Sequence, residues 1–305
     1  QLPEGDFLDP YISNMAGEAT YRVWEPTYEE KIALKAYYGL DQPIYVQYFK
    51  WVGNMSRGSF GTVLDLQIPV LELIGERIVL TVVLAAATVV LTWLLAIPIG
   101  IYSAVRQHSV GDYTFTFIGF IGLAVPDFLL ALVLMYLAFV YFDSSIGGLF
   151  STAYADAQWS WGKLVDMLSH TWIPAIVLGT SGTAALIRIM RANLLDELSK
   201  PYVITARAKG LREWRLIAKY PVRVALNPLI STVGYVLPYL ISGSIIVSVV
   251  LSLPTLGPVL LRSLLQQDMY LAGTILMFIG VMTVIGTLIS DVLLMLADPR
   301  IRMQT

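Results

Sequence analysis

Side chains that could catalyse a reaction or hold a metal are scarce in this chain of 305 residues. It has no Cys and two His, His108 and His170, which lie far apart in the sequence. The missing cysteines exclude thiolate zinc sites, iron–sulfur clusters and disulfides. The phosphate-binding pattern G-x-x-x-x-G-K-[ST], the zinc pattern H-E-x-x-H and the nucleophile pattern G-x-S-x-G do not occur either. We therefore expect no catalytic residue, no metal site and no cofactor, and we do not expect an enzyme.

Two carboxylates, Asp127 and Asp291, lie inside strongly apolar stretches. Acids within a membrane are functional candidates, either as proton relays or as substrate-binding groups. Asp127 follows Pro126, where a helix must break, so capping of the restarted helix is the favoured role. Asp291 precedes the basic C-terminus, where pairing with Arg300 or Arg302 is favoured. A proton-coupled carrier needs more buried ionisable groups than these.

The elements that must carry these residues are those of a polytopic membrane protein. The chain is 56% hydrophobic and 14% charged, whereas soluble domains carry roughly a quarter charged residues. Several apolar stretches reach the roughly 20 residues that cross a bilayer, so we expect an all-α fold with five visible spans. The expected spans are 78–104, 113–142, about 170–190, 224 to about 250 and about 272–296, with a re-entrant or interfacial piece at 251–261.

The charges of the loops predict the orientation. Residues 188–223 contain nine Lys or Arg and three acids, so by the positive-inside rule this loop is cytoplasmic, as is the basic C-terminal "DPRIR". Residues 1–76 then form an extracytoplasmic segment, and residues 77–305 form the transmembrane domain with a cytoplasmic loop at about 191–223. An exported segment of this size requires a removed signal or a preceding helix. We favour a preceding helix, which gives six in the complete protein.

Polar side chains also follow one of the expected spans. Tyr and Ser recur there in a stripe that could line a hydrated path, and ordinary helix packing is an equally good interpretation. The residues are Tyr235, Tyr239, Ser242, Ser244 and Ser248. Small residues in "LAAATVV" and "LGTSGTAAL" predict helices that approach one another closely.

The basic loop has more order than a topology signal needs. Pro201 stands at a plausible first helical position, and Gly210 is a plausible left-handed C-cap between two short helices. Beyond the glycine, apolar residues lie partly on one face of the second helix; they are Leu211, Trp214, Leu216 and Ile217. An apolar ridge with a basic rim, held outside the lipid, fits a groove on another protein.

At these residues the sequence resembles a known family. "TARAKGL" followed by "ALNP" resembles the cytoplasmic EAA-type loop of permease subunits in ABC importers, above all the first permease of the dipeptide/oligopeptide/nickel family. "LGLDQPIYVQYFKWVGNMSRGSFG", "SLPTLGPVLLRSLLQQDM" and the terminal "DPRIR" agree with it in the same order. The glutamate that names the EAA motif is missing, because its place falls on Ile204, and residues 9–35 do not match well.

The resemblance implies a type I ABC importer fold with a sister permease, two cytoplasmic ATPases and an external binding protein as partners. ATP and Mg would be bound by the ATPase subunits. Independently of the resemblance, the net charge of -2 argues against nucleic acid as a partner. The resemblance also implies that the loop docks on an ATPase. The residues to which this role is carried over are Ala206, Arg207, Ala208, Lys209, Gly210 and Leu211.

The predicted function is that of a permease subunit that forms half of an ATP-driven path for peptides or similar small solutes. An oligosaccharide importer of the same family is one alternative. An ion-coupled secondary carrier is another, from a different class. The predicted location is the cell membrane, with the N-terminal segment outside and the C-terminus in the cytoplasm.

Overall fold

The computed structural model describes residues 32–33, 36, 41–63, 66, 68–142, 147–155, 157–242 and 245–297, without the side chains of residues 142, 235, 237 and 240–242. The described secondary structure is helical apart from one isolated bridge between Thr62 and Pro69. The chain divides into two compact units. One comprises residues 1–79 and 255–279, and the other comprises residues 80–254 and 280–305.

The first unit contains α3 (Ile44–Ser56), the beginning of α4 (Val70–Val105), α14 (Leu256–Leu265) and the beginning of α15 (Met269–Ala297). Glycines let aromatic rings approach the α15 backbone. A Cβ added at Gly273 would lie 3.2 Å from the Trp51 ring. The rings of Phe60 and Phe278 have centroids 5.7 Å apart. Aromatic packing therefore attaches α3 and its following turn to the first turns of α15.

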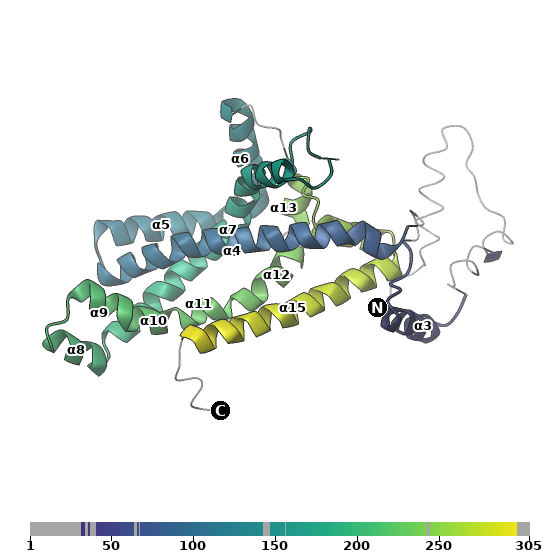
Figure 1. Ribbon diagram of the computed structural model, residues 1–305. Helices are drawn as coiled ribbons and strands as arrows, with labels where there is room; N and C mark the ends of the chain where they lie inside the picture. The colour runs from purple at the N-terminus through teal and green to yellow at the C-terminus, as the bar shows by residue number, and fades with distance from the viewer. Residues whose placement is uncertain are drawn as a thin grey trace. The chain divides into compact units, whose positions relative to one another are not determined.

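The second unit is built around α7 (Trp161–Leu198), which contacts α5 (Val110–Ala124), α6 (Asp127–Phe142), α10 (Pro221–Ala225) and α11 (Asn227–Ser231) (Figure 1). Small residues permit this close packing. A Cβ added at Gly179 of α7 would lie 2.9 Å from the Thr92 hydroxyl of α4, and one at Gly122 would lie 2.9 Å from a Thr180 methyl. The prediction that small residues bring helices together is thus confirmed.

In the part of the chain that the structure describes, three helices are long and apolar enough to cross a membrane: α4, α7 and α15. They correspond to the first, third and last expected spans. The second expected span is the α5–α6 pair, which bends by 101° at its break. The bend is located where Pro126 cannot continue the hydrogen bonding of α5.

The fourth expected span was wrong as a single helix. Short helices replace it, and Pro228, in the first turn of α11, has no backbone N–H with which to continue the hydrogen bonding of α10. They are α10, α11, α12 (Val233–Ser242) and α13 (Ile245–Val250). Of the piece expected to be re-entrant or interfacial, residues 251–255 lie outside the helices, as expected, whereas α14 begins at Leu256 and is a regular helix that includes Gly257 and Pro258.

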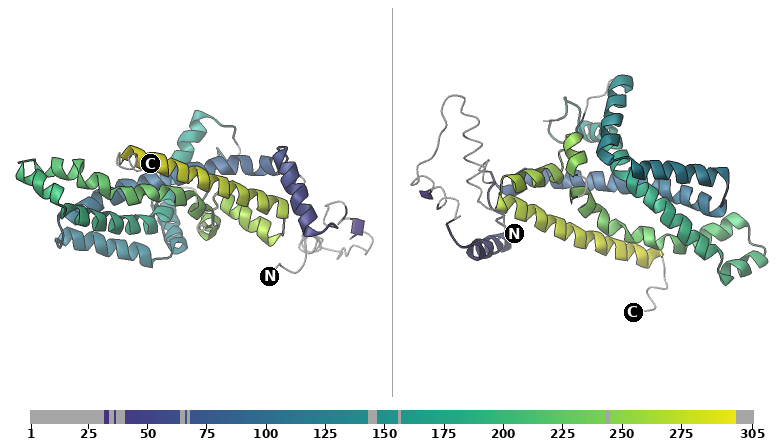
Figure 2. Two further views of the ribbon diagram at one scale, coloured as in Figure 1. Left: turned by 90° about the horizontal axis from the view of Figure 1, so that it is seen from below. Right: turned by 180° about the vertical axis from the view of Figure 1, so that it is seen from behind.

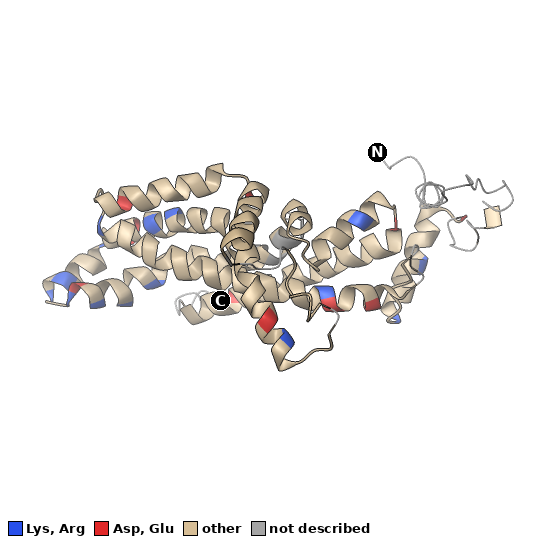
Figure 3. Ribbon diagram, turned by 90° about the horizontal axis from the view of Figure 1, so that it is seen from above, with Lys and Arg blue, Asp and Glu red and all other residues tan. Residues whose placement is uncertain are grey.

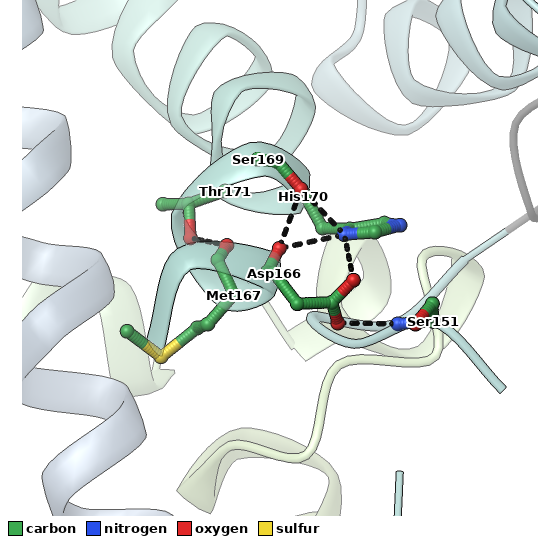
Figure 4. Close-up of polar contacts among 6 residues, drawn as sticks. All are labelled: Ser151, Asp166, Met167, Ser169, His170 and Thr171. Atoms are coloured by element: carbon green, nitrogen blue, oxygen red, sulfur yellow. Dashed lines mark hydrogen bonds and ion pairs between the residues drawn. The ribbon is translucent and has the colours of Figure 1, made fainter. Parts of the chain in front are cut away.

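A polar network fixes the loop that precedes α7 (Figure 4). The Ser151 backbone N–H donates to the Asp166 carboxylate at 2.8 Å, and His170 Nδ1 lies 2.7 Å from the Asp166 carbonyl oxygen. Lys163 is buried beside this loop, where its ammonium donates to the Ala157 carbonyl at 2.8 Å and lies over the Phe150 ring. These contacts hold the loop on the first turns of α7.

Metal ligation has no support in this region. Within the described ranges, no group of three or more His, Cys, Asp or Glu side chains could hold a metal ion. His170 lies beside the Asp166 carboxylate, with 3.6 Å between His170 Nδ1 and Asp166 Oδ1. The contacts of His170 are those of a side chain that fixes the start of α7.

Candidate coupling loop and translocation cavity

The basic loop folds as two short helices joined at a glycine, as the sequence predicted. α8 (Pro201–Ala208) begins with Pro201 in its first turn, and α9 (Glu213–Lys219) follows the glycine. We refer to residues 201–219 as the α8–α9 loop. Its two helices protrude beyond the neighbouring ends of α4 and α5 in both views of Figure 2. Lys and Arg gather on this protruding part (Figure 3).

Gly210 makes the turn between the two helices. Its φ of +79° lies in the left-handed region, which glycine adopts without a Cβ penalty. The Gly210 N–H donates to the Arg207 carbonyl at 3.0 Å, and the Leu211 N–H reaches back to the Ala206 carbonyl at 3.4 Å. A Cβ added at Gly210 would meet nothing within 4 Å. The glycine is therefore required by the backbone conformation and not by crowding.

An ion pair spans the same turn. The Arg207 guanidinium donates from Nε to the Glu213 carboxylate at 3.0 Å, and each side chain is about half exposed, at 50% and 51%. Hydrogen bonding from Arg207 holds the pKa of the Glu213 carboxyl below its ordinary value, and hydrogen bonding to Glu213 raises the pKa of Arg207. Because both groups are so exposed, solvent and salt screen much of this attraction.

The α8–α9 loop is anchored by a small hydrophobic core of its own. Val203, Leu216 and Ile217 are buried together, with Ile101 of α4 and Leu198 of α7 packed against them. This arrangement corrects the expected apolar ridge, in which Leu216 and Ile217 were to be available to a partner. They face inward because the second helix must bury one face against its own chain.

The exposed apolar surface of the loop consists of Ile204, Leu211 and Trp214, at 58%, 38% and 64% exposure. Ile204 stands at the place of the missing EAA glutamate. The residues expected to contact an ATPase are exposed apart from Ala206, which is partly buried. Beside the loop is a hollow of about 740 Å³, whose lining includes Ala206, Lys209 and Leu211.

A second cavity, of about 440 Å³, lies among the helices of the second unit. Its walls come from α4, α7 and α12, together with Thr232, which precedes α12. Hydroxyl and aromatic groups interrupt an otherwise apolar lining, and they include Thr88, Thr92, Trp93, Ser181 and Tyr239. Residues of the segments "LAAATVV" and "LGTSGTAAL" contribute to the cavity wall. The sequence predicted only close helix packing for these two segments.

The five residues of the expected polar stripe have different locations. Tyr239 lines the cavity, whereas Ser248 is buried at 1% exposure among the residues around Val247. The side chains of Tyr235 and Ser242, and the whole of Ser244, lie outside the described residues. Helical spacing alone placed Tyr239 and Ser248 in one stripe, but Tyr239 belongs to α12 and Ser248 belongs to α13.

Long apolar helices, a cavity among them and a protruding basic loop define a polytopic membrane transport protein. Residues 96–303 of the chain match the model of a protein family described as "binding-protein-dependent transport system inner membrane component". The chain belongs to this family. It is the permease subunit of a binding-protein-dependent ABC importer of the inner membrane, which confirms the predicted transport role.

Individual relatives resemble most of the chain. The oligopeptide transport system permease protein AppB of Bacillus subtilis (strain 168) is 39% identical over 265 residues, covering 87% of this chain and 82% of AppB. The dipeptide transport system permease protein DppB of Escherichia coli (strain K12) is 29% identical over 290 residues, covering 90% and 86%.

Among solved structures, an inward-facing conformation of the MetNI methionine ABC transporter shares the fold. The TM-score is 0.57 with 15% sequence identity, covering 75% of this chain and 97% of the other. This likeness shows an ABC transporter permease fold. A component of a binding-protein-dependent system implies a binding protein and an ATPase as partners.

Proposed function

We propose that the α8–α9 loop is the surface through which a cytoplasmic ATPase moves this permease. The observation that carries the proposal is the combination of an exposed tip and a buried anchor in one short segment. Ile204, Leu211 and Trp214 offer exposed apolar area, while Val203, Leu216 and Ile217 tie the same helices to α4 and α7. A force applied at the tip is therefore transmitted to long helices instead of being lost in a flexible loop.

The contact residues proposed for the ATPase are Ala206, Arg207, Ala208, Lys209, Gly210 and Leu211. The positive-inside rule supports a cytoplasmic location for the loop and the C-terminus, and an extracytoplasmic location for residues 1–76. The complete assembly would contain this permease in a type I importer arrangement with a sister permease, two ATPases and an external binding protein. Residues 77–305 would form its transmembrane domain.

Peptides are the proposed solutes. AppB is named as an oligopeptide permease and DppB as a dipeptide permease, and both resemble this chain over most of its length. The cavity of about 440 Å³ supports a path for a small flexible solute. The proposed path residues remain Tyr235, Tyr239, Ser242, Ser244 and Ser248, together with the hydroxyl groups of Thr88, Thr92 and Ser181.

Replacement of Gly210 tests the coupling role in the reconstituted importer. Gly210→Val forces a β-branched residue into a left-handed conformation, at a cost of about 1–3 kcal/mol, and should abolish peptide-stimulated ATP hydrolysis while the protein still inserts. Gly210→Asn is the matched control, because Asn tolerates this conformation, and it should retain most of the stimulation. Normal stimulation in Gly210→Val would refute the proposal. Uptake of oligosaccharides in place of peptides would refute the proposed substrate only.

A further inference from the structure

The short helix α3 exposes an apolar and aromatic stripe along most of its length. Four large side chains lie at the i, i+3, i+4 and i+7 positions, which share one face of a helix. They are between 37% and 70% exposed, and no residue of α3 is buried. An exposed apolar surface of this kind marks contact with lipid or with another protein. The residues of this surface, which we call the α3 stripe, are Tyr45, Tyr48, Phe49 and Val52.

The opposite side of α3 is polar or small. Lys50, Gly53 and Asn54 are exposed there. Tyr45 and Asn54 are separated by about two and a half helical turns, so they lie on opposite sides of the helix. Lys50 is the one Lys, Arg, Asp or Glu among the residues of α3. The helix is therefore amphipathic, with little charge.

The apolar face of α3 continues from its contact with α15 into the stripe. Trp51 packs over Gly273 of α15, and its ring centroid lies 6.1 Å from that of Tyr48 in the stripe. The segment after α3 is attached to the same turns of α15, because the Thr274 hydroxyl donates to the Phe60 carbonyl at 3.4 Å. The surface that binds α15 and the surface that is exposed are thus adjacent parts of one apolar face.

The attachment to α15 lies at the level of the membrane boundary. α15 is apolar enough to cross a membrane and has 29 residues. Its length is about 43 Å at 1.5 Å per residue, whereas the hydrocarbon core of a bilayer is about 30 Å thick. Gly273, the fifth residue of the helix, lies about 6 Å from its beginning. A span centred in the bilayer therefore places Gly273 close to the boundary between headgroups and hydrocarbon.

We propose that α3 lies flat in the membrane interface beside the beginning of α15, with the α3 stripe in contact with phospholipid and Lys50 directed toward water. With 13 residues α3 is about 20 Å long, too short to cross the membrane, so the whole stripe meets lipid only when the helix lies along the surface. Tyr and Trp are enriched at this level of the bilayer, and amphipathic helices bind there by their apolar face. The choice of the outer leaflet rests on the orientation proposed above for residues 1–76, whereas the contact with lipid does not.

Spin-label EPR in the reconstituted importer tests this placement. The chain has no Cys, so Tyr45→Cys and its matched control Asn54→Cys each carry one nitroxide when the partner subunits are also free of Cys. The vesicles consist of phosphatidylethanolamine and phosphatidylglycerol. The label at Tyr45→Cys should collide preferentially with oxygen, which concentrates in hydrocarbon, and the label at Asn54→Cys with a water-soluble nickel chelate. The oxygen-to-nickel ratio should be severalfold higher for Tyr45→Cys. Val52→Cys should match Tyr45→Cys, because both lie at one depth in a flat helix.

The other outcomes would overturn the inference. Equal ratios for Tyr45→Cys and Asn54→Cys would place both faces of α3 in water. Shielding of the Tyr45→Cys label from both reagents, with or without added binding protein, would assign the stripe to a protein partner. Peptide uptake by the same vesicles separates this result from the proposed function. Normal uptake with equal ratios would refute only the interfacial helix, whereas a high ratio without uptake would refute the proposed substrate and leave α3 in the interface.

Discussion

Asp112 and Arg191 join the beginning of α5 to the C-terminal half of α7 by two hydrogen bonds. Arg191 donates from Nε to Asp112 Oδ1 at 3.0 Å and from Nη2 to Oδ2 at 2.9 Å. The His108 backbone N–H donates to the same carboxylate at 3.0 Å. Asp112 is buried, with its side chain at 4% exposure, and Arg191 is at 28%. The pair therefore fixes the α4–α5 turn to the helix that leads into the α8–α9 loop.

Removal of one member of this pair should be more damaging than removal of both. Asp112→Asn leaves the Arg191 charge without its partner in a poorly hydrated place. We expect a loss of about 2–3 kcal/mol in the free energy of unfolding, which is smaller than the loss for a fully buried pair because Arg191 is partly exposed. The double variant Asp112→Asn/Arg191→Met should recover part of this loss. Thermal unfolding in detergent measures both. Equal stability of Asp112→Asn and the wild type would show that the bond is not important for the fold.

The buried and exposed apolar residues of the α8–α9 loop should have separable effects. Leu216→Ala removes a side chain with 0% exposure and should cost about 2–5 kcal/mol of local stability. Faster amide hydrogen exchange across α8 and α9 would report this loss. Trp214→Ala should leave the exchange unchanged and weaken ATPase stimulation, because Trp214 is 64% exposed. If Leu216→Ala weakened stimulation without faster exchange, the division between anchor and contact surface would be wrong.

The ion pair across the Gly210 turn predicts a small acid-dependent effect. Arg207 lowers the pKa of Glu213 in the folded loop, so the stabilisation is present above the ordinary glutamate value of about 4.3 and is lost as pH falls through the lower folded value. Amide exchange of the turn, measured relative to the rest of the chain, should therefore accelerate below about pH 4 in the wild type. Glu213→Gln should lack this step. High salt should reduce the difference between the two, since both side chains are half exposed.

Filling the cavity should block transport without damaging the fold. Gly182 lines the cavity, and a Cβ added there would meet nothing within 4 Å. Gly182→Phe should accordingly insert and fold normally but lower the rate of peptide uptake severalfold or more, because the ring occupies the path. Gly280→Phe is the matched control on α15, where an added Cβ also meets nothing within 4 Å. Equal uptake by the two variants would mean that the solute does not pass through this cavity.

The sequence was informative where local chemistry determines structure. Pro201 and Gly210 predicted both helices of the α8–α9 loop, because a first-turn proline and a left-handed glycine act within a few residues. The expected apolar ridge of the second helix was wrong for Leu216 and Ile217. Helical spacing predicts which residues share a face of a helix, but it does not predict what that face contacts. Leu216 and Ile217 are covered by Leu198 of α7 and by Ile101, which lies far away in the sequence.

The cavity depends on a long-range arrangement of helices that no short sequence pattern encodes. Hydrophobicity over residues 224–250 indicated one span, whereas short helices occupy this stretch, with turn residues at Leu226 and Thr232 between them. The cavity brings together Thr88 of α4, Ser181 of α7 and Tyr239 of α12, which lie far apart in the sequence.

Cross-linking from the tip of the α8–α9 loop tests the central claim most directly. The sequence contains no cysteine, so Ala208→Cys provides a single attachment point for a maleimide photo-cross-linker next to Gly210. Ser59→Cys provides an equally exposed control in the segment assigned to the outer side. After illumination of the assembled importer, mass spectrometry should identify the ATPase as the product of Ala208→Cys and not of Ser59→Cys. An ATPase product from Ser59→Cys, or none from Ala208→Cys, would contradict the account.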